Sequence, residues 1–169
     1  MITPAYVQTM ARYNSWQNSQ LTRVVNVMDQ ADLNLDRGAF FGSIQRTLSH
    51  LLWGDQLWLS RFDATSPPPG AHLPEGPEGE VTISEWSADR LACDGRIRTW
   101  AMGLRQIDLS GDLTWVSGAS GQEFSKPLAF CIVQFFNHQT HHRGQVHAML
   151  TAAGQEAPVS DLIYTPEDA

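Results

Sequence analysis

Four of the six histidines fall within ten positions near the end of the chain: His138, His141, His142 and His147. On a helical wheel of about 100° per residue, His138 and His142 lie one turn apart on one flank of the apolar stripe. His141 points further towards solvent, and His147 lies on the other side. Two imidazoles at this spacing are a common helical half of a divalent-metal site, because one turn brings both nitrogens within reach of one ion. The spacing alone also allows hydrogen-bonded histidines at the core edge with no metal.

The same spacing occurs in zinc metalloproteases, but Gln139 stands where those enzymes place a glutamate general base, so protease chemistry lacks its proton acceptor. A third metal ligand must come from another segment, and the remaining histidines are His50 and His72. His50 is the better candidate because it lies in a predicted helix, which holds a side chain more firmly than a loop does. The wheel permits this choice without requiring it, since His50 shares its side of the helix with Trp53.

Apolar residues recur at three- and four-residue intervals in four stretches, which predicts four long helices. Thr3 before Pro4 marks the start of the first, and Thr82 and Glu85 have the spacing of a capping box before the third. A stretch rich in proline and glycine, residues 63–80, separates the second and third helices. The predicted helices cover residues 4–29, 40–62, 84–106 and 125–153.

The hydrophobic period changes between Leu109 and Lys126, where apolar and aromatic residues flank the run from Gly118 to Gly121. This pattern predicts a short β-hairpin, which must lean on the helices to be stable. At 169 residues the chain has the length of one domain. The sequence therefore predicts an all-α, single-domain four-helix bundle over residues 1–169, with the hairpin before the last helix.

Two segments carry a family resemblance: Thr47-Leu-Ser-His-Leu-Leu-Trp53 in the second helix and Asn137-His-Gln-Thr-His-His-Arg-Gly-Gln145 in the last. Together they resemble the DinB-like (DinB/YfiT-like) family of metal-dependent proteins, over essentially the whole chain. The resemblance implies that His50, His138 and His142 bind one divalent ion, with nickel or zinc expected first and iron or manganese as alternatives. It also implies a homodimer and a metal-dependent thiol transferase that uses a low-molecular-weight thiol.

A three-histidine site leaves a coordination position for water or a small-molecule substrate, which is typical of a catalytic centre and not of a structural zinc. Three functions therefore stay open. The first is the thiol transferase, and the second is a hydrolase that acts through metal-bound hydroxide. The third is a non-catalytic metal-binding protein of a stress response. A carboxylate near the ion would favour the hydrolase.

Four further residues are candidates for roles around the metal. Trp53, one turn from His50, is the best candidate for a pocket wall, and Gln145 could contact a metal-bound histidine or be a surface amide. Asp55 and Arg143 both face the apolar side of their helices and would be buried charges unless paired. We therefore predict an interhelical salt bridge between them, with binding of a substrate carboxylate as the other option for Arg143.

Composition narrows the remaining functions. Lys and Arg number 11 against 18 Asp and Glu, and the resulting net charge of −7 opposes binding to nucleic acids or anionic membranes. From the sequence pattern we expect neither a signal peptide nor a membrane span, and we expect Cys93 and Cys131 to be buried thiols in a reducing cytoplasm. Motifs of serine hydrolases, nucleotide hydrolases and dinucleotide enzymes are missing from the sequence.

Overall fold

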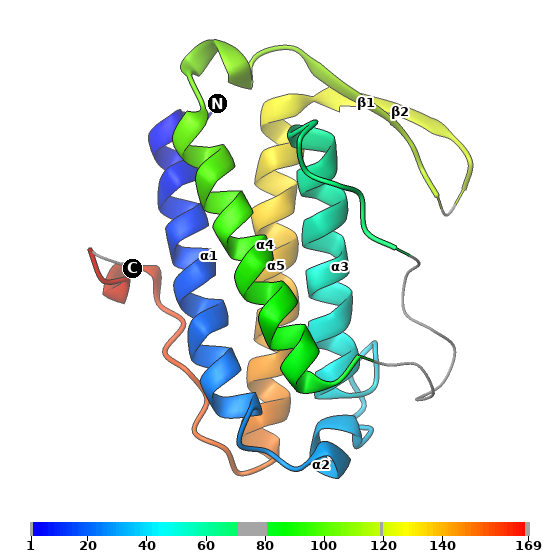
Figure 1. Ribbon diagram of the computed structural model, residues 1–169, viewed down its shortest axis with the longest axis vertical. Helices are drawn as coiled ribbons and strands as arrows, with labels where there is room; N and C mark the ends of the chain where they lie inside the picture. The colour runs from blue at the N-terminus through cyan, green and yellow to red at the C-terminus, as the bar shows by residue number, and fades with distance from the viewer. Residues whose placement is uncertain (1, 71–80, 119, 168–169) are drawn as a thin grey trace.

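Four long helices form the bundle that the sequence predicts (Figure 1). The computed structural model describes residues 2–70, 81–118 and 120–167, so His72 and most of the proline-rich stretch lie outside the described residues. The long helices are α1 (Pro4–Val25), α3 (Ile44–Phe62), α4 (Ile83–Gly103) and α5 (Leu128–Ala152). Short elements lie between and after them: α2 (Gln30–Asn34), the 3₁₀ helix η1 (Gln106–Leu109), strands β1 (Asp112–Val116) and β2 (Glu123–Pro127), and the 3₁₀ helix η2 (Leu162–Tyr164).

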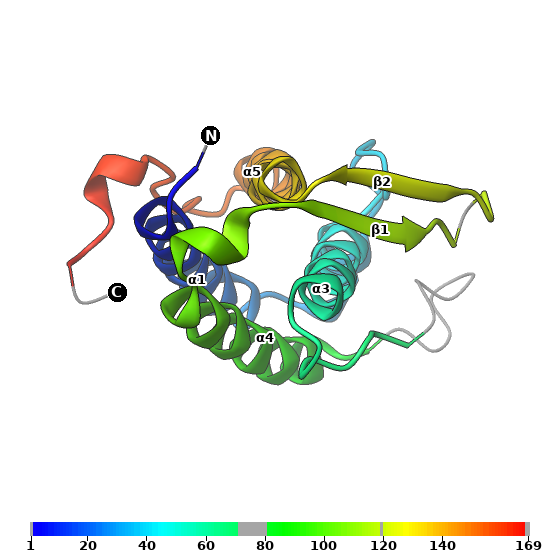
Figure 2. The ribbon, with the colours of Figure 1, turned by 90° about the horizontal axis from the view of Figure 1, so that it is seen from above.

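Seen from above, the four long helices stand at the corners of a quadrilateral in the order α1, α4, α3, α5 (Figure 2). Helices α1 and α5 run in one direction, and α3 and α4 run in the other (Figure 1). Because α3 and α4 are parallel, the chain must travel the length of the bundle between them, and residues 63–82 make this connection. Helix α3 therefore has α5 as an antiparallel neighbour, and these two helices carry the candidate metal ligands.

Side-chain caps set the starts of three helices. The hydroxyl of Thr3 accepts a hydrogen bond from the backbone N–H three residues on at 3.2 Å, and that of Ser43 does the same at 3.1 Å. Thr82 and Glu85 form both halves of a capping box, which confirms that prediction. Each cap supplies an acceptor for a backbone donor that the helix itself leaves unpaired.

Several predicted boundaries were wrong by a few residues. Helix α1 ends at Val25, and the chain turns into the separate short helix α2, which the periodicity did not reveal. Helix α3 begins at Ile44 because Ser43 caps it, so residues 40–43 belong to the preceding loop. Residues 125–127 pair with β1 and extend the hairpin, so α5 begins only at Leu128. In the last two cases a cap at Ser43 and pairing with β1 competed with the apolar pattern.

The predicted hairpin is present, and it leans on α3 through aromatic rings. Strands β1 and β2 are antiparallel, with Trp115 opposite Phe124. The ring of Trp115 stacks on that of Phe124 at a centroid distance of 5.6 Å and meets Trp58 of α3 edge-on at 5.5 Å. These contacts provide the tertiary support that a two-stranded hairpin needs.

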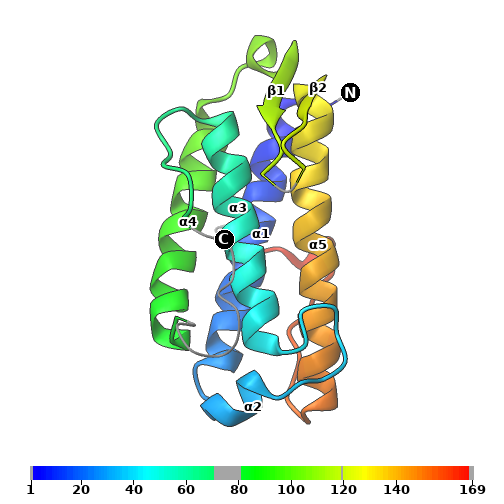
Figure 3. The same ribbon diagram turned by 90° about the vertical axis from the view of Figure 1, so that its right-hand side faces the viewer.

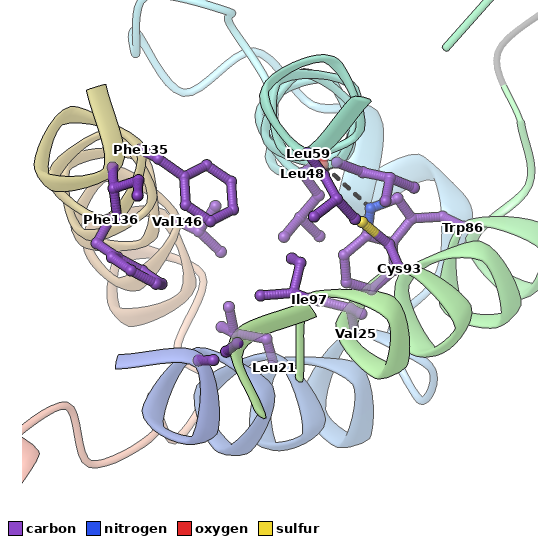
Figure 4. Close-up of a cluster of buried hydrophobic side chains, with 14 of the residues drawn as sticks. Leu21, Val25, Leu48, Leu59, Trp86, Cys93, Ile97, Phe135, Phe136 and Val146 are labelled. Atoms are coloured by element: carbon purple, nitrogen blue, oxygen red, sulfur yellow. Dashed lines mark hydrogen bonds between the residues drawn. The ribbon is translucent and has the colours of Figure 1, made fainter. Parts of the chain in front are cut away.

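The core lies between all four long helices (Figure 4). Trp86 of α4 is fully buried, and its indole N–H donates to the backbone carbonyl of Leu48 on α3 at 3.1 Å. Cys93 and Cys131 are free and buried, as the sequence predicts. Within the described ranges, no helix combines the length and the apolar character that a membrane crossing requires. Buried apolar residues shown in Figure 4 come from every long helix: Leu21, Val25, Leu48, Leu59, Trp86, Ile97, Phe135, Phe136 and Val146.

Candidate metal centre

Three imidazole rings converge between α3 and α5: His50 from α3, and His138 and His142 from α5. One ring nitrogen from each lies within 4.8 Å of the other two, and the Nε2 atoms of His50 and His138 are 3.1 Å apart. Two nitrogens bound to one tetrahedral ion at about 2.05 Å each would be about 3.3 Å apart. The rings are therefore close to the spacing that a shared ion requires. The two segments that were predicted to supply the ligands, one on α3 and one on α5, lie side by side.

A glycine on α3 makes room for one of these rings. Gly54 lies one turn after His50 and is buried. A Cβ placed on Gly54 would lie only 2.8 Å from Cε1 of His138, which is closer than real Cβ contacts come. The missing side chain therefore allows the His138 ring to lie against the α3 backbone. Sequence reasoning missed this residue, although an interior helix glycine costs about 1 kcal/mol relative to alanine and so indicates a packing or functional reason.

Gln145 fixes the orientation of a second ring. Its Oε1 atom is 2.7 Å from Nδ1 of His142. An amide oxygen can only accept a hydrogen bond, so Nδ1 of His142 carries the proton and Nε2 is left as the basic nitrogen. The structure thus places Gln145 in contact with a candidate ligand, the arrangement in which an outer residue sets the tautomer of a metal-binding imidazole.

His138 and His142 are held in their neutral form. Burial lowers the pKa of His138 to about 4, and the neighbouring rings of His142 and His141 add to this shift. Burial also lowers the pKa of His142, against the opposing effect of its contact with Gln145. Neutral imidazole is the form that binds a metal, so both rings are available as ligands at neutral pH. Within the described residues the buried Nδ1 of His138 has no hydrogen-bond partner.

Aromatic side chains surround His50. The ring of Phe41 stacks on it at a centroid distance of 4.0 Å and also lies 5.5 Å from the ring of His142. The ring centroid of Trp53 lies 6.4 Å from that of His50, with an interplanar angle of 27°. The indole N–H of Trp53 donates to the carbonyl of Gly70 at 3.1 Å. The structure therefore places Trp53 beside the cluster, where a pocket wall was expected. Phe41 was missed because the apolar pattern placed it in the second helix, whereas it lies in the loop before α3 and turns towards the histidines.

The other histidines lie apart from the cluster's ligand set. His141 is exposed, and its ring contacts that of His142 at a centroid distance of 4.8 Å. His147 lines a different cavity of about 250 Å³ between α1, α5 and the C-terminal segment. Both positions agree with the wheel, which directed these residues away from the flank shared by His138 and His142.

The predicted salt bridge between Asp55 and Arg143 is wrong. Both residues lie in the described part of the chain and are buried, but Asp55 pairs with Arg90 of α4, at 2.7 Å between Oδ2 and Nη1. Arg143 instead donates to Oδ1 of Asn14 on α1. The wheel showed correctly that both charges face the interior. It could not show which neighbouring helix would supply the partner, and the sequence pattern gave no sign that Arg90 is buried.

Arg90 and Arg143 belong to one chain of contacts that joins all four long helices, which we call the buried ion network. Arg90 also pairs with Asp94, one turn later on α4, at 2.7 Å. Asp94 accepts hydrogen bonds from two side chains of α1, Asn14 at 3.1 Å and Asn18 at 3.0 Å. Two carboxylates therefore stand against two guanidinium groups, which balances charge in a medium where an unpaired ion is costly. The network comprises Asn14, Asn18, Asp55, Arg90, Asp94 and Arg143.

A four-helix bundle in which three histidines converge defines a candidate metalloprotein. Comparison with known proteins assigns it more closely: the model of the DinB family matches residues 1–169, and the chain belongs to this family. It is 22% identical over 149 residues to protein DinB of Bacillus subtilis (strain 168), covering 88% of this chain and 87% of the relative. The fold is similar to the crystal structure of a DinB-like protein from Bacillus cereus ATCC 10987, with a TM-score of 0.64 and 15% identity, covering 87% of this chain and 90% of the other.

Proposed function

We propose that the protein binds one divalent metal ion through one ring nitrogen each of His50, His138 and His142. The observation that carries this proposal is the convergence of the three nitrogens within 4.8 Å. Three features of the surroundings suit a metal ion. Burial keeps the rings of His138 and His142 neutral. The contact of Gln145 with Nδ1 of His142 leaves Nε2 as the nitrogen that can bind the ion, and Gly54 leaves space for the His138 ring.

The family resemblance favours nickel or zinc, with iron and manganese as alternatives, and imidazole ligands suit nickel, zinc and iron alike. Imidazole nitrogens carry no negative charge when they bind a metal, so an ion held only by them would keep its positive charge and would favour an anionic ligand such as a thiolate at its open position. Within the described residues the cluster contains no cysteine, because Cys93 and Cys131 are buried elsewhere. A thiol at this centre must therefore come from a small molecule.

We infer that the protein is a transferase that uses a low-molecular-weight thiol as substrate. The chain's own residues would hold and orient the reactants: Phe41 and Trp53 flank His50 with apolar surface, and Gln145 keeps the His142 tautomer. A metal-dependent hydrolase is the second candidate, and it needs a general base near the ion. Among the described residues no carboxylate joins the histidine cluster, and Asp55 is occupied by Arg90. This donor set supports the transferase over the hydrolase.

Metal analysis of tag-free protein tests the ligand assignment. We expect about one equivalent of divalent metal in the wild type and a loss on the order of 100-fold in affinity for His142→Ala, because a direct ligand contributes more than the outer residues that orient it. His147→Ala is the matched control, since it removes a histidine of the same helix that lies outside the cluster. Equal metal content in the wild type and in His142→Ala would contradict the assignment.

Thiol binding tests the reaction class. The cobalt-loaded protein should develop a sulfur-to-metal charge-transfer absorption when low-molecular-weight thiols are added, because the ion would stabilise the thiolate. A metal-loaded protein that ignores thiols but hydrolyses esters or amides would support the hydrolase instead. A loaded protein that does neither would support the non-catalytic metal-binding function.

A further inference from the structure

The loop that connects α2 to α3 presents a large aromatic side chain to solvent beside the histidine cluster. Phe40 is 84% exposed, the most exposed of the large hydrophobic side chains in the described part of the chain. The next residue, Phe41, turns inwards and packs against the rings of His50 and His142. This loop lies beside the first turns of α3 and against α5 (Figure 3).

The loop has a defined shape that holds Phe40 in place. The backbone N–H of Arg37 donates to the carbonyl of Gly42 at 2.9 Å, and the N–H of Gly42 donates to the carbonyl of Ala39 at 2.8 Å. Gly38 and Gly42 have φ angles of 75° and 79°, a region that other residues rarely adopt. Two glycines and two closing hydrogen bonds therefore build a tight turn with Phe40 at its tip.

The two phenylalanines link this tip to the candidate metal ligands. The ring of Phe40 meets that of Phe41 edge-on, at a centroid distance of 4.9 Å and an angle of 85°. Phe41 in turn stacks on His50 at 4.0 Å. A continuous aromatic surface therefore runs from the histidine cluster to solvent. Because Phe40 is exposed, its ring contributes little to the stability of the fold. A rigid aromatic side chain on a fixed loop loses little conformational entropy when it contacts a ligand.

We propose that Phe40 is a specificity-determining residue, and that the small molecule bound at the metal centre carries an aromatic or large apolar group which Phe40 contacts. The inference rests on the proposed function and adds the chemical class of the ligand. Phe41 positions His50 and His142 by packing against them, whereas Phe40 contacts no candidate ligand and is free to select what binds next to them. Its loss should therefore change ligand preference and leave metal affinity intact.

The test uses the cobalt-loaded full chain and two alkyl thiols, phenylmethanethiol and 2-mercaptoethanol, titrated by the charge-transfer absorption. The wild type should bind the aromatic thiol about 3- to 10-fold more tightly than the polar one, the range expected for an added aromatic contact. In Phe40→Ala this preference should disappear, while the affinities for cobalt and for 2-mercaptoethanol stay unchanged. Phe40→Tyr should keep most of the preference, because it keeps the ring.

Ile163→Ala is the matched control, since Ile163 is 83% exposed but lies on η2, in the C-terminal segment. It should leave both thiol affinities unchanged. Thiol binding with no aromatic preference in the wild type, or a preference that survives Phe40→Ala, would overturn the inference and leave the proposed function standing. A loaded protein with no response to any thiol would contradict the proposed function itself. If Phe40→Ala converts a dimer to a monomer, the side chain belongs to an interface between copies and the inference is wrong.

Discussion

Helices α3 and α5 contribute to two polar clusters that differ in almost every physical respect. His50 and Asp55 lie five residues apart on α3, and His142 and Arg143 are neighbours on α5. The histidine cluster is only partly buried and the pKa values of His138 and His142 are lowered there, whereas the buried ion network contains four charged groups in the core. In the network, positive and negative groups compensate one another within the protein. The histidine cluster instead brings together three imidazole nitrogens that could bind a cation.

This difference indicates that the buried ion network stabilises the fold and that the histidine cluster is arranged to bind a ligand. The charged groups of the network are already paired within the protein, so they do not require an external ion. Removing one partner of a pair would leave the other as an uncompensated buried charge, which is strongly destabilising. Neutral imidazoles that face one another have electron pairs available for a cation. Variants of the two regions should therefore fail in different ways, one by unfolding and the other by losing metal.

The largest effect is expected for Asp55→Ala, which removes one carboxylate and leaves Arg90 without one of its two acidic partners. Breaking a buried ion pair from one side typically costs about 3–5 kcal/mol. We expect a loss of this size in the free energy of unfolding of the metal-free protein, measured by urea denaturation. Asp108→Ala is the control, because it removes a carboxylate from the exposed pair with Arg105 and should change stability little.

Gly54→Ala should damage the histidine cluster more than the fold. The new methyl group would meet the His138 ring at 2.8 Å, so the ring must move away from its two partners. We expect metal affinity to fall by about 10- to 100-fold, measured by competition with a chelator, a loss comparable to that of removing an outer residue of a metal site. Gly144→Ala is the control on α5, where a Cβ meets nothing within 4 Å. An unchanged affinity in Gly54→Ala would show that the close approach does not position His138.

Gln145→Leu removes the acceptor that fixes the tautomer of His142. The ring stays in place, but its proton is no longer confined to Nδ1, so we expect about a 10-fold loss of metal affinity with little change in unfolding free energy. Isothermal titration of the metal-free protein with zinc measures the first quantity, and urea denaturation measures the second. If the variant lost stability and kept its metal affinity, Gln145 would be a structural residue only.

The pH dependence of the metal-free protein tests the burial of His138. The pKa of His138 is about 4 in the folded state, below the value of about 6.5 for an unperturbed histidine. Between these two values the unfolded chain binds more protons than the folded one, so stability should be lost as the pH falls from 6.5 towards 4. Urea midpoints across this range should fall less steeply for His138→Gln. A parallel fall in both proteins would assign the pH dependence to other groups.

Local sequence patterns were sufficient to predict the long helices, the hairpin and part of the candidate metal site. Thr3, Thr82 and Glu85 placed helix starts to within one residue because a cap acts on the next few residues of the same chain. The shared flank of His138 and His142 also follows from helical spacing alone. His50 could be preferred over His72 only by its helix, and the family resemblance then supplied the third ligand. These inferences required no knowledge of how one helix packs on another.

Contacts between helices were decided by the tertiary structure. A helical wheel gives the direction of a side chain about its own axis, but the rotation and offset of neighbouring helices follow from the packing of the entire core. For this reason Arg90, and not Arg143, pairs with Asp55. The same packing brings the α3 backbone at Gly54 against His138 and seats Phe41 on His50, which makes the site specific to this arrangement of α3, α5 and the loop before α3.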